Sequence, residues 1–423
     1  MATRTSAARA QSVGEQAVIQ RPDSSDDMVH GALVDVRAQL SGSPIALPAR
    51  MGVSVTEGVG GFAQVCSTIA RQLAVAKIMG DAAKVKACEE QFAKYQQCDP
   101  GWLEIAEKYA QFQLQIQLNK GKVPYVLYND IDDFVIDLPL NDGDNIGFVG
   151  DWGTGQDEAK KVLAQLSRKE LKAVIHLGDI YYSCTDFEVQ NYFLQIWQTY
   201  FDIKQVSSFS LSGNHDMYGG GGPYYTLLKT LGQPASYCCI RTLHWQFVLM
   251  DTGLHDRTPA GTDPTYLEDT EVAWIKRRIA TADGRKTVLL SHHQLFSRYS
   301  SIIDPPPSGQ LGMAINARLQ QQLVDILPQV TLWLWGHEHD FVVYEKQCGV
   351  LARCVGSGAV PVLTSPPPVI KHPEIGANDA IRPGAEGDFF THGYAVMQLQ
   401  GANATVSYYQ DTDEDNPMWV DNL

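Results

Sequence analysis

This chain of 423 residues contains few cysteines, few long apolar runs and no excess of positive charge. Its eight cysteines contain no CxxC pair and are too few for a disulfide scaffold, so we expect them to be mostly reduced and packed as small apolar side chains. Cys348 and Cys354 flank a short turn and are the pair that could join in an oxidising compartment. The N-terminus has no apolar stretch of signal-peptide or membrane-span length, which predicts a cytoplasmic protein without a membrane partner.

Basic residues number 33 against 48 acidic residues, which gives a formal net charge of -15. Nucleic-acid backbones are normally bound by clustered Lys and Arg, so a nucleic-acid partner is not expected. A small phosphorylated substrate is also an anion and needs local positive charge. Bound metal cations can supply that charge in an acidic protein.

The first 135 residues differ from the rest of the chain. Residues 1–60 carry Ser, Pro and Gly without a sustained period, which predicts a mostly irregular or disordered segment. Apolar residues recur at helical spacing over 61–135, which predicts a helical accessory region. We favour packing of these helices on each other or on the remaining chain. A lid-like role, or a homo-oligomer formed through the helices, is the alternative.

Strand-like and helix-like segments alternate after residue 140, which predicts an α/β domain over 140–410 and an acidic C-terminal tail over 411–423. The predicted strands are 146–150, 173–178, 209–213, 246–250, 287–291 and 331–336. Because ligands bind at the carboxyl ends of strands in such sheets, side chains that follow these strands should converge.

Five short motifs follow predicted strands in a fixed order. They are GDWG (150–153), GDIYY (178–182), GNHD (213–216), SHH (291–293) and GHEH (336–339). Each motif alone would more often be structural than catalytic, but the intervals between them leave room for βα units, which chance matches would seldom respect. Their mixed Asp, Asn, His and Tyr side chains indicate first-row transition metals. Two such ions can hold a phosphoryl group between them and create a hydroxide nucleophile.

This order of motifs resembles the calcineurin-like metallophosphoesterases, and within them the purple acid phosphatase branch. The family pattern reads GDxG, GDxxY, GNH(D/E), VxxH and GHxH, and four of the five motifs match it. In the fourth, VLLSHH, the valine lies four residues before His292, and Leu289 occupies the expected position. The resemblance implies a β-sandwich flanked by helices.

The resemblance also implies two metal sites that share Asp179. Asp151, Asp179, Tyr182 and His339 would hold one ion, and Asp179, Asn214, His292 and His337 would hold the other. We choose His292 over His293 because the family's ligand is the first histidine after the strand.

Tyr182 distinguishes the branches of this superfamily. Most members use a first motif DxH, but Trp152 and Gly153 follow Asp151, so that histidine is absent. A phenolate from Tyr182 can replace it, and this ligand favours Fe(III) at the first site beside Fe(II), Zn(II) or Mn(II) at the second. Tyr181 is the competing choice. The family spacing selects Tyr182, and Tyr181 is expected to point the other way.

The resemblance further implies that His215 contacts the phosphate and assists the departing oxygen. Asp216 either orients His215 or supports the loop. His293, Arg298 and Tyr218 are candidate substrate contacts, although a structural role is the alternative for Arg298.

The sequence therefore predicts hydrolysis of phosphate monoesters by a dinuclear metal centre with a metal-bound hydroxide nucleophile. A phosphodiesterase that acts on nucleotides or lipid head groups is the alternative, because the same metal core cleaves both kinds of ester. A non-catalytic metal-binding module that recruits partners is an alternative of another class.

Overall fold

The computed structural model describes residues 59–96, 98–99, 101–118, 120–256, 263–303, 312–365 and 367–423. Apart from its last two residues, the segment 1–60 that was predicted to be irregular lies outside them. Within the described residues, no helix combines the length and apolar character needed to cross a membrane.

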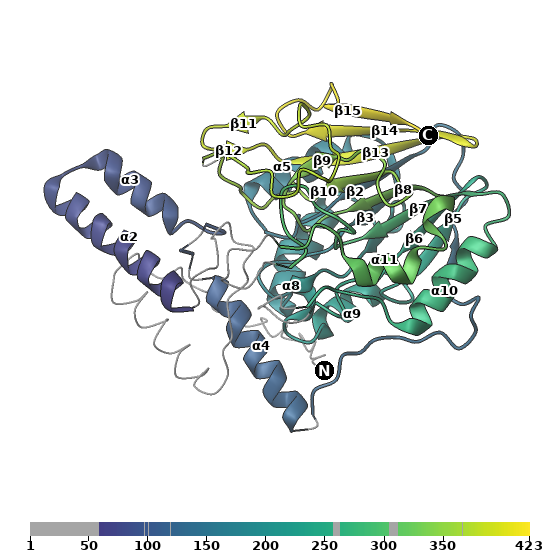
Figure 1. The fold of residues 1–423 in the computed structure, drawn as a ribbon, viewed down its shortest axis with the longest axis horizontal. Helices are drawn as coiled ribbons and strands as arrows, with labels where there is room; N and C mark the ends of the chain where they lie inside the picture. Colours follow the sequence, from purple (N-terminus) through teal and green to yellow (C-terminus); the bar gives the residue numbers. More distant parts are fainter. Residues whose placement is uncertain are drawn as a thin grey trace, which may run out of the picture.

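Two β-sheets pack face to face (Figure 1). The first has the order β1 (Val135–Asp137), β5 (Cys238–Arg241), β6 (Trp245–Leu249), β7 (Lys286–Ser291), β8 (Val330–Trp335), β10 (Ala352–Val355) and β9 (Phe341–Val343). The second has the order β15 (Trp419–Asn422), β14 (Asn403–Gln410), β13 (Gly393–Gln400), β2 (Asn145–Val149), β3 (Leu171–His176) and β4 (Ser207–Ser210). A separate two-stranded ribbon joins β11 (Ala385–Glu386) to β12 (Phe389–Phe390). The six predicted strands correspond to β2, β3, β4, β6, β7 and β8.

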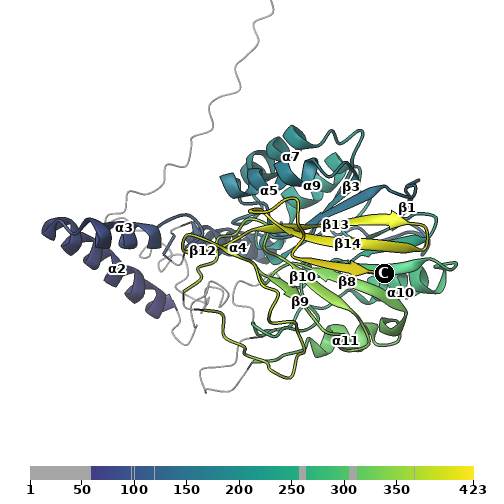
Figure 2. The same cartoon turned by 90° about the horizontal axis from the view of Figure 1, so that it is seen from above.

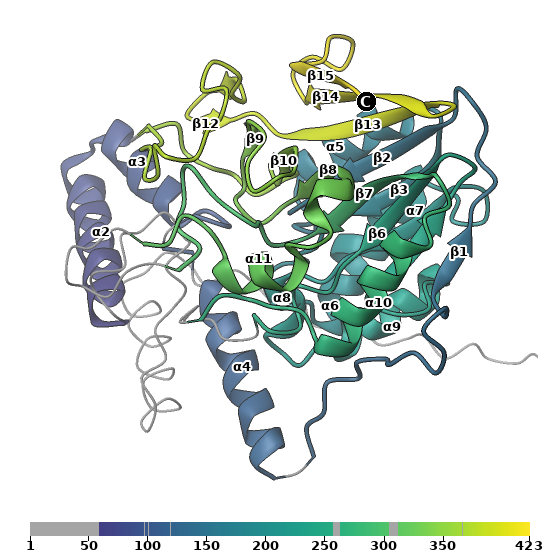
Figure 3. The same cartoon turned by 45° about the vertical axis from the view of Figure 1, so that its right-hand side comes forward.

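Helices cover the outer face of each sheet (Figure 2). The six-stranded sheet is covered by α5 (Asp157–Ser167), η1 (Val189–Leu194), α7 (Gln195–Tyr200) and α9 (Gly222–Leu231). The seven-stranded sheet is covered by α10 (Asp269–Ala280) and α11 (Ala317–Leu323), which lie in front of β6 to β8 in Figure 3. Short helical segments are α6 (Asp186–Glu188), α8 (Asn214–Met217) and η2 (Leu327–Gln329).

The alternation of side chains along each strand explains these layers. In β8, Leu332 and Leu334 pack between the two sheets, whereas Trp333 and Trp335 pack against the helix side. Successive strand residues point to opposite faces, so a strand that is apolar at every position is buried on both. The predicted fold class, an α/β β-sandwich flanked by helices, is confirmed.

The accessory region contains a hairpin of α2 (Val59–Met79) and α3 (Ala82–Gln91), followed by α4 (Trp102–Gln117), drawn in purple to blue in Figure 1. Residues 120–134 are not helical but connect α4 to β1, which shortens the helical region predicted over 61–135. Tyr125 in this connection stacks on Tyr237, with 5.6 Å between ring centroids.

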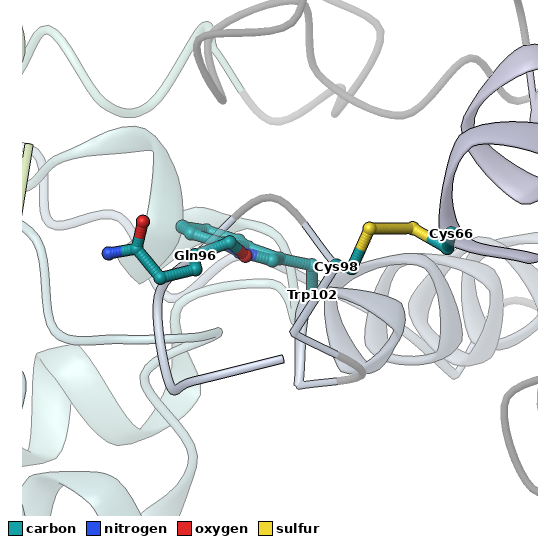
Figure 4. Close-up of a disulfide and its surroundings, with 4 residues drawn as sticks. All are labelled: Cys66, Gln96, Cys98 and Trp102. Atoms are coloured by element: carbon teal, nitrogen blue, oxygen red, sulfur yellow. A yellow bond between two sulfur atoms is a disulfide. The ribbon is translucent and has the colours of Figure 1, made fainter. Parts of the chain in front are cut away.

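A disulfide joins Cys66 to Cys98 (Figure 4), so the expectation of reduced cysteines is wrong for these two. The turn after α3 brings Cys98 back beside α2, a contact between residues 32 apart that local sequence patterns do not reveal. Cys348 and Cys354, the pair considered from the sequence, are both free.

The acidic segment 411–423 is not a separate tail, because its β15 pairs with β14 at the edge of the six-stranded sheet. Asp421 is buried and accepts hydrogen bonds from Arg353 Nε at 2.8 Å and Arg353 Nη2 at 2.7 Å. Because Arg353 lies on β10 of the other sheet, this ion pair joins the two sheets.

We predict that Asp421→Ala lowers the free energy of unfolding by about 3 kcal/mol, because it leaves the Arg353 guanidinium buried without its partner. Chemical denaturation followed by circular dichroism measures this loss. Glu414→Gln is the matched control in the same segment. Its pair with Arg168 is exposed, so it should cost less than about 1 kcal/mol. Equal, small losses in both variants would contradict a structural role for residues 411–423.

Candidate metal centre

All five motifs meet at one edge of the sandwich. The parallel strands β2, β3 and β4 carry the first three motifs, and the parallel strands β7 and β8 carry the last two. Val149 lies opposite His176 in the six-stranded sheet, and Ser291 lies opposite Trp335 in the seven-stranded sheet. Neighbouring motifs therefore begin side by side, as the sequence predicted.

His292 lies at the middle of the cluster. Its Nε2 atom is 3.3 Å from Asp179 Oδ2, 3.2 Å from Asn214 Oδ1 and 3.1 Å from His337 Nδ1. Its other ring nitrogen, Nδ1, lies 2.8 Å from the Leu177 carbonyl oxygen and can donate to it. That bond fixes the tautomer in which Nε2 carries the lone pair that a metal ligand needs.

A phenol completes the other half of the cluster, and it belongs to Tyr181. Its hydroxyl lies 2.9 Å from Asp151 Oδ1, 3.2 Å from Asp179 Oδ2 and 2.8 Å from His339 Nε2. Burial and the carboxylates of Asp151 and Asp179 raise the pKa of Tyr181 well above its ordinary value.

Tyr182, the predicted phenolate ligand, is not brought to the cluster. Its hydroxyl donates a hydrogen bond to Asp99 and accepts one from the Tyr95 backbone N–H, both in the turn before α4. In this geometry the hydroxyl beside Asp151 and Asp179 is that of Tyr181, and not that of Tyr182, which the family spacing selects. Asp99, which accepts the hydrogen bond of the Tyr182 hydroxyl, lies 83 residues earlier in the chain, in a region that the resemblance does not cover.

Asn214 is oriented by a residue that was predicted to contact substrate. Its Nδ2 group donates to the Tyr218 hydroxyl at 2.6 Å, which turns Oδ1 toward His292. Because Tyr218 is buried and makes this hydrogen bond, we infer that it positions the Asn214 amide.

His215 lies beside the cluster with one nitrogen already bonded. Nδ1 is 2.7 Å from the Tyr182 carbonyl oxygen, and Nε2 is 3.9 Å from Asp179 Oδ2. Burial lowers the pKa of His215. Its ring packs against Tyr181, with 4.4 Å between centroids.

Asp216 supports the loops and does not orient His215. Its carboxylate accepts the backbone N–H groups of Gly213 at 2.7 Å, Asp179 at 2.9 Å and Ile180 at 3.1 Å. Burial and the nearby charge of Asp179 raise the pKa of Asp216 to about 7. Of the two roles that the sequence left open, the structure shows the second.

The two remaining candidate substrate contacts lie in different surroundings. His293 is buried beside His292 and His337, with Nε2 2.9 Å from Asp256 Oδ2. Arg298 instead donates to both carboxylate oxygens of Asp379, at 2.8 and 2.6 Å, and to the Ile375 carbonyl oxygen. These bonds give Arg298 the structural role that was its alternative.

The backbone is strained at four residues of the cluster. Asp151, Asp179, His337 and His339 have φ angles of 54°, 75°, 72° and 49°, in the left-handed region that side-chain-bearing residues seldom adopt. Strain of this kind costs roughly 1–3 kcal/mol per residue and is concentrated at functional sites.

The residues fit a pair of cations. Candidate ligand atoms of Asp151, Asp179 and His292 lie within 4.8 Å of one another, and so do those of His292, His293 and His337. A Cβ atom on Gly213 would lie 2.0 Å from Asp179 Oδ1, so glycine is required for the carboxylate to reach this position. Buried carboxylates and imidazoles held this close are the donors that first-row metals prefer.

The fold and the cluster define a metal-dependent hydrolase class. Residues 145–341 match the family described as calcineurin-like phosphoesterase. This match confirms the resemblance that the motifs predicted. The family implies a dinuclear metal centre and supports metal-dependent hydrolysis of phosphoesters.

Several individual proteins are also similar to this chain. The 3',5'-cyclic adenosine monophosphate phosphodiesterase CpdA of Pseudomonas aeruginosa is 32% identical over 111 residues, which are 26% of this chain and 35% of that protein. The purple acid phosphatase PPD1 of yellow lupin (Lupinus luteus) seeds is 13% identical, with a TM-score of 0.43 over 66% of this chain and 53% of that one. GAP50 of Plasmodium, described as the anchor in the inner membrane complex, is 14% identical, with the same TM-score over 67% of this chain and 89% of that one. TM-scores this low carry no functional argument.

We predict that Gly213→Ala weakens metal binding by roughly 10- to 100-fold, because the added methyl group displaces the Asp179 carboxylate. Calorimetric titration with Mn²⁺ measures the change. Gly222→Ala is the matched control, since its Cβ would meet nothing within 4 Å. Wild-type affinity in a folded Gly213→Ala protein would show that Asp179 does not bind the metal.

Proposed function

We propose that this protein hydrolyses phosphate monoesters with chemistry of the purple acid phosphatase type. The observation that carries the proposal is the Tyr181 hydroxyl, which lies within 3.2 Å of Asp151, Asp179 and His339. Gly153 occupies the position of the histidine in the DxH motif of other branches, and the indole of the preceding Trp152 donates to the Ala159 carbonyl oxygen. The Tyr181 phenol therefore lies beside Asp151 and Asp179, where the first metal site would otherwise lack the ligand that the histidine supplies in other branches.

The proposed ligand sets share Asp179. Asp151, Asp179, Tyr181 and His339 would hold one ion, and Asp179, Asn214, His292 and His337 would hold the other. A phenolate is a hard anionic ligand, so we assign Fe(III) to the first site and Fe(II), Zn(II) or Mn(II) to the second. Such a pair of ions supplies positive charge for the phosphoryl oxygens and makes water acidic enough to act as a nucleophile near neutral pH.

The protein's own contribution at the leaving group is His215. With Nδ1 bonded to the Tyr182 carbonyl oxygen, the nitrogen on the cluster side is Nε2. In the imidazolium form of His215, in which both ring nitrogens carry a hydrogen, we assign to Nε2 the proton that the departing alkoxide or phenoxide takes up. Tyr218 and the Leu177 carbonyl oxygen keep Asn214 and His292 in their ligand orientations.

The second candidate is a phosphodiesterase, and the CpdA relative favours it. A cyclic or bridging phosphate would meet the same metals and the same His215. The proposed partner is in either case a small phosphorylated molecule, because the net charge of -15 opposes binding to nucleic acid. The cytoplasmic location and a homo-oligomer formed through the N-terminal helices stay predictions.

The proposal predicts that protein loaded with iron and a divalent metal cleaves 4-nitrophenyl phosphate at least 10-fold faster, in kcat/KM, than bis(4-nitrophenyl) phosphate. Release of nitrophenolate measures both rates. His215→Asn should lower kcat by roughly 100- to 10,000-fold while the bound metals remain, which attributes the activity to this centre. A preference for the diester would instead establish the second candidate.

We predict that iron-loaded wild-type protein shows a visible phenolate-to-iron charge-transfer band and that Tyr181→Phe loses it. Tyr182→Phe is the control, because that hydroxyl is bonded to Asp99, so the band should remain. Absorption spectra, with circular dichroism to verify folding, distinguish the two variants. A band that survives in Tyr181→Phe and disappears in Tyr182→Phe would return the ligand role to Tyr182.

A further inference from the structure

The described residues from the end of α3 to the first residue of α4 (92–96, 98–99 and 101–102) lie against the candidate metal centre and are named here the accessory turn. Three of its residues are Tyr95, Asp99 and Trp102, which are all buried. Tyr95, Trp102 and Ile105 form one apolar cluster with Tyr181, Tyr182, Tyr218 and Val360. The accessory region, which lies outside the matched family segment, thus packs directly on residues of the candidate metal centre.

Hydrogen bonds attach the accessory turn to two motif loops. Tyr95 donates its hydroxyl to the Thr154 carbonyl oxygen at 2.7 Å, and Lys94 Nζ lies 3.0 Å from the same oxygen. Asp99 accepts from the Tyr182 hydroxyl and from the Tyr95 backbone N–H. The turn is therefore bound to the loops that follow β2 and β3.

Close packing at two glycines fixes the following helix as well. A Cβ on Gly101 would lie 2.6 Å from the Tyr182 ring. A Cβ on Gly220, in the loop after GNHD, would lie 2.3 Å from the ring of Phe112 on α4. Figures 1 and 3 both show α4 next to α8, which carries His215. Glycine is needed at both positions for α4 to lie this close to the centre.

Trp102 is the residue of the turn that faces His215. The ring centroids of Trp102 and His215 are 5.9 Å apart, and the Trp102 indole also meets Tyr182 edge-on at 5.1 Å. Its Nε1 group donates to the Gln96 carbonyl oxygen at 2.9 Å, which fixes the ring. Figure 4 shows Trp102 next to Cys98, whose disulfide ties the turn to α2.

We propose that Trp102 is a specificity-determining residue, which limits the size of the leaving group that can lie beside His215. The inference rests on the proposed function, because His215 marks the leaving-group side. A buried indole held by Gln96 and Tyr182 cannot move aside without breaking those contacts. The accessory turn therefore selects small monoesters over those with extended aromatic leaving groups.

The test compares phenyl phosphate with 2-naphthyl phosphate as substrates of the full, metal-loaded chain. Trp102→Ala should raise the ratio of kcat/KM for naphthyl to that for phenyl by about 10-fold, because the space of the indole becomes available. Trp102→Leu, which keeps an apolar side chain for folding, should raise it in the same direction. Trp102→Phe, which keeps an aromatic ring in place, should leave the ratio within about 3-fold of wild type.

A ratio unchanged or lowered in both folded variants, Trp102→Ala and Trp102→Leu, would overturn the inference even if overall activity falls. The affinities of phenylphosphonate and 2-naphthylphosphonate, measured by calorimetry, test the same space without turnover. If no ester is cleaved, the proposed function fails, while a gain in naphthylphosphonate affinity of about 10-fold in Trp102→Ala would still support the restriction at Trp102. A wild-type protein that binds neither phosphonate would overturn both.

Discussion

Buried carboxylates that bind backbone N–H groups of neighbouring motifs hold this centre together. Asp216 accepts three such groups from the loops after β3 and β4, and Asp151 accepts the His337 N–H at 2.6 Å from the opposite sheet. Charge-assisted bonds of this kind are strong, and they can offset the cost of left-handed backbone at the ligand positions. The strand pairing aligns the strand ends, and these bonds fix the loops that follow them so that the donor atoms lie close together.

Backbone carbonyl oxygens set the orientation of the imidazoles. A backbone carbonyl oxygen lies at Nδ1 of both His292 and His215, which directs each Nε2 toward the cluster. Orientation of a ligand by its outer bonds is the usual means by which proteins tune metal sites. Here the outer partners are strand and loop backbone, so the fold itself specifies which nitrogen faces the substrate side.

A contact from the accessory region orients one of the two tyrosines in the GDIYY motif of the catalytic domain. GDIYY offers two adjacent phenols, and Asp99 takes the hydroxyl of Tyr182. The phenol left facing Asp151 and Asp179 is that of Tyr181. A segment outside the family pattern thus selects the candidate ligand, and its Trp102 lies where the leaving group would depart. The accessory turn is in this sense part of the centre.

The sequence by itself determined the six predicted strands, the layered fold and most of the residues that meet at its edge. Apolar alternation and the position of a motif after a strand depend only on residues that are neighbours in the chain, so the sequence alone reveals them. Tertiary structure alone placed the Tyr181 hydroxyl, and not that of Tyr182, beside Asp151, paired Cys66 with Cys98 and placed Asp421 against Arg353. Each of these depends on a contact between segments at least 30 residues apart. Local periodicity carries no information about such contacts, because they form only when separate elements pack.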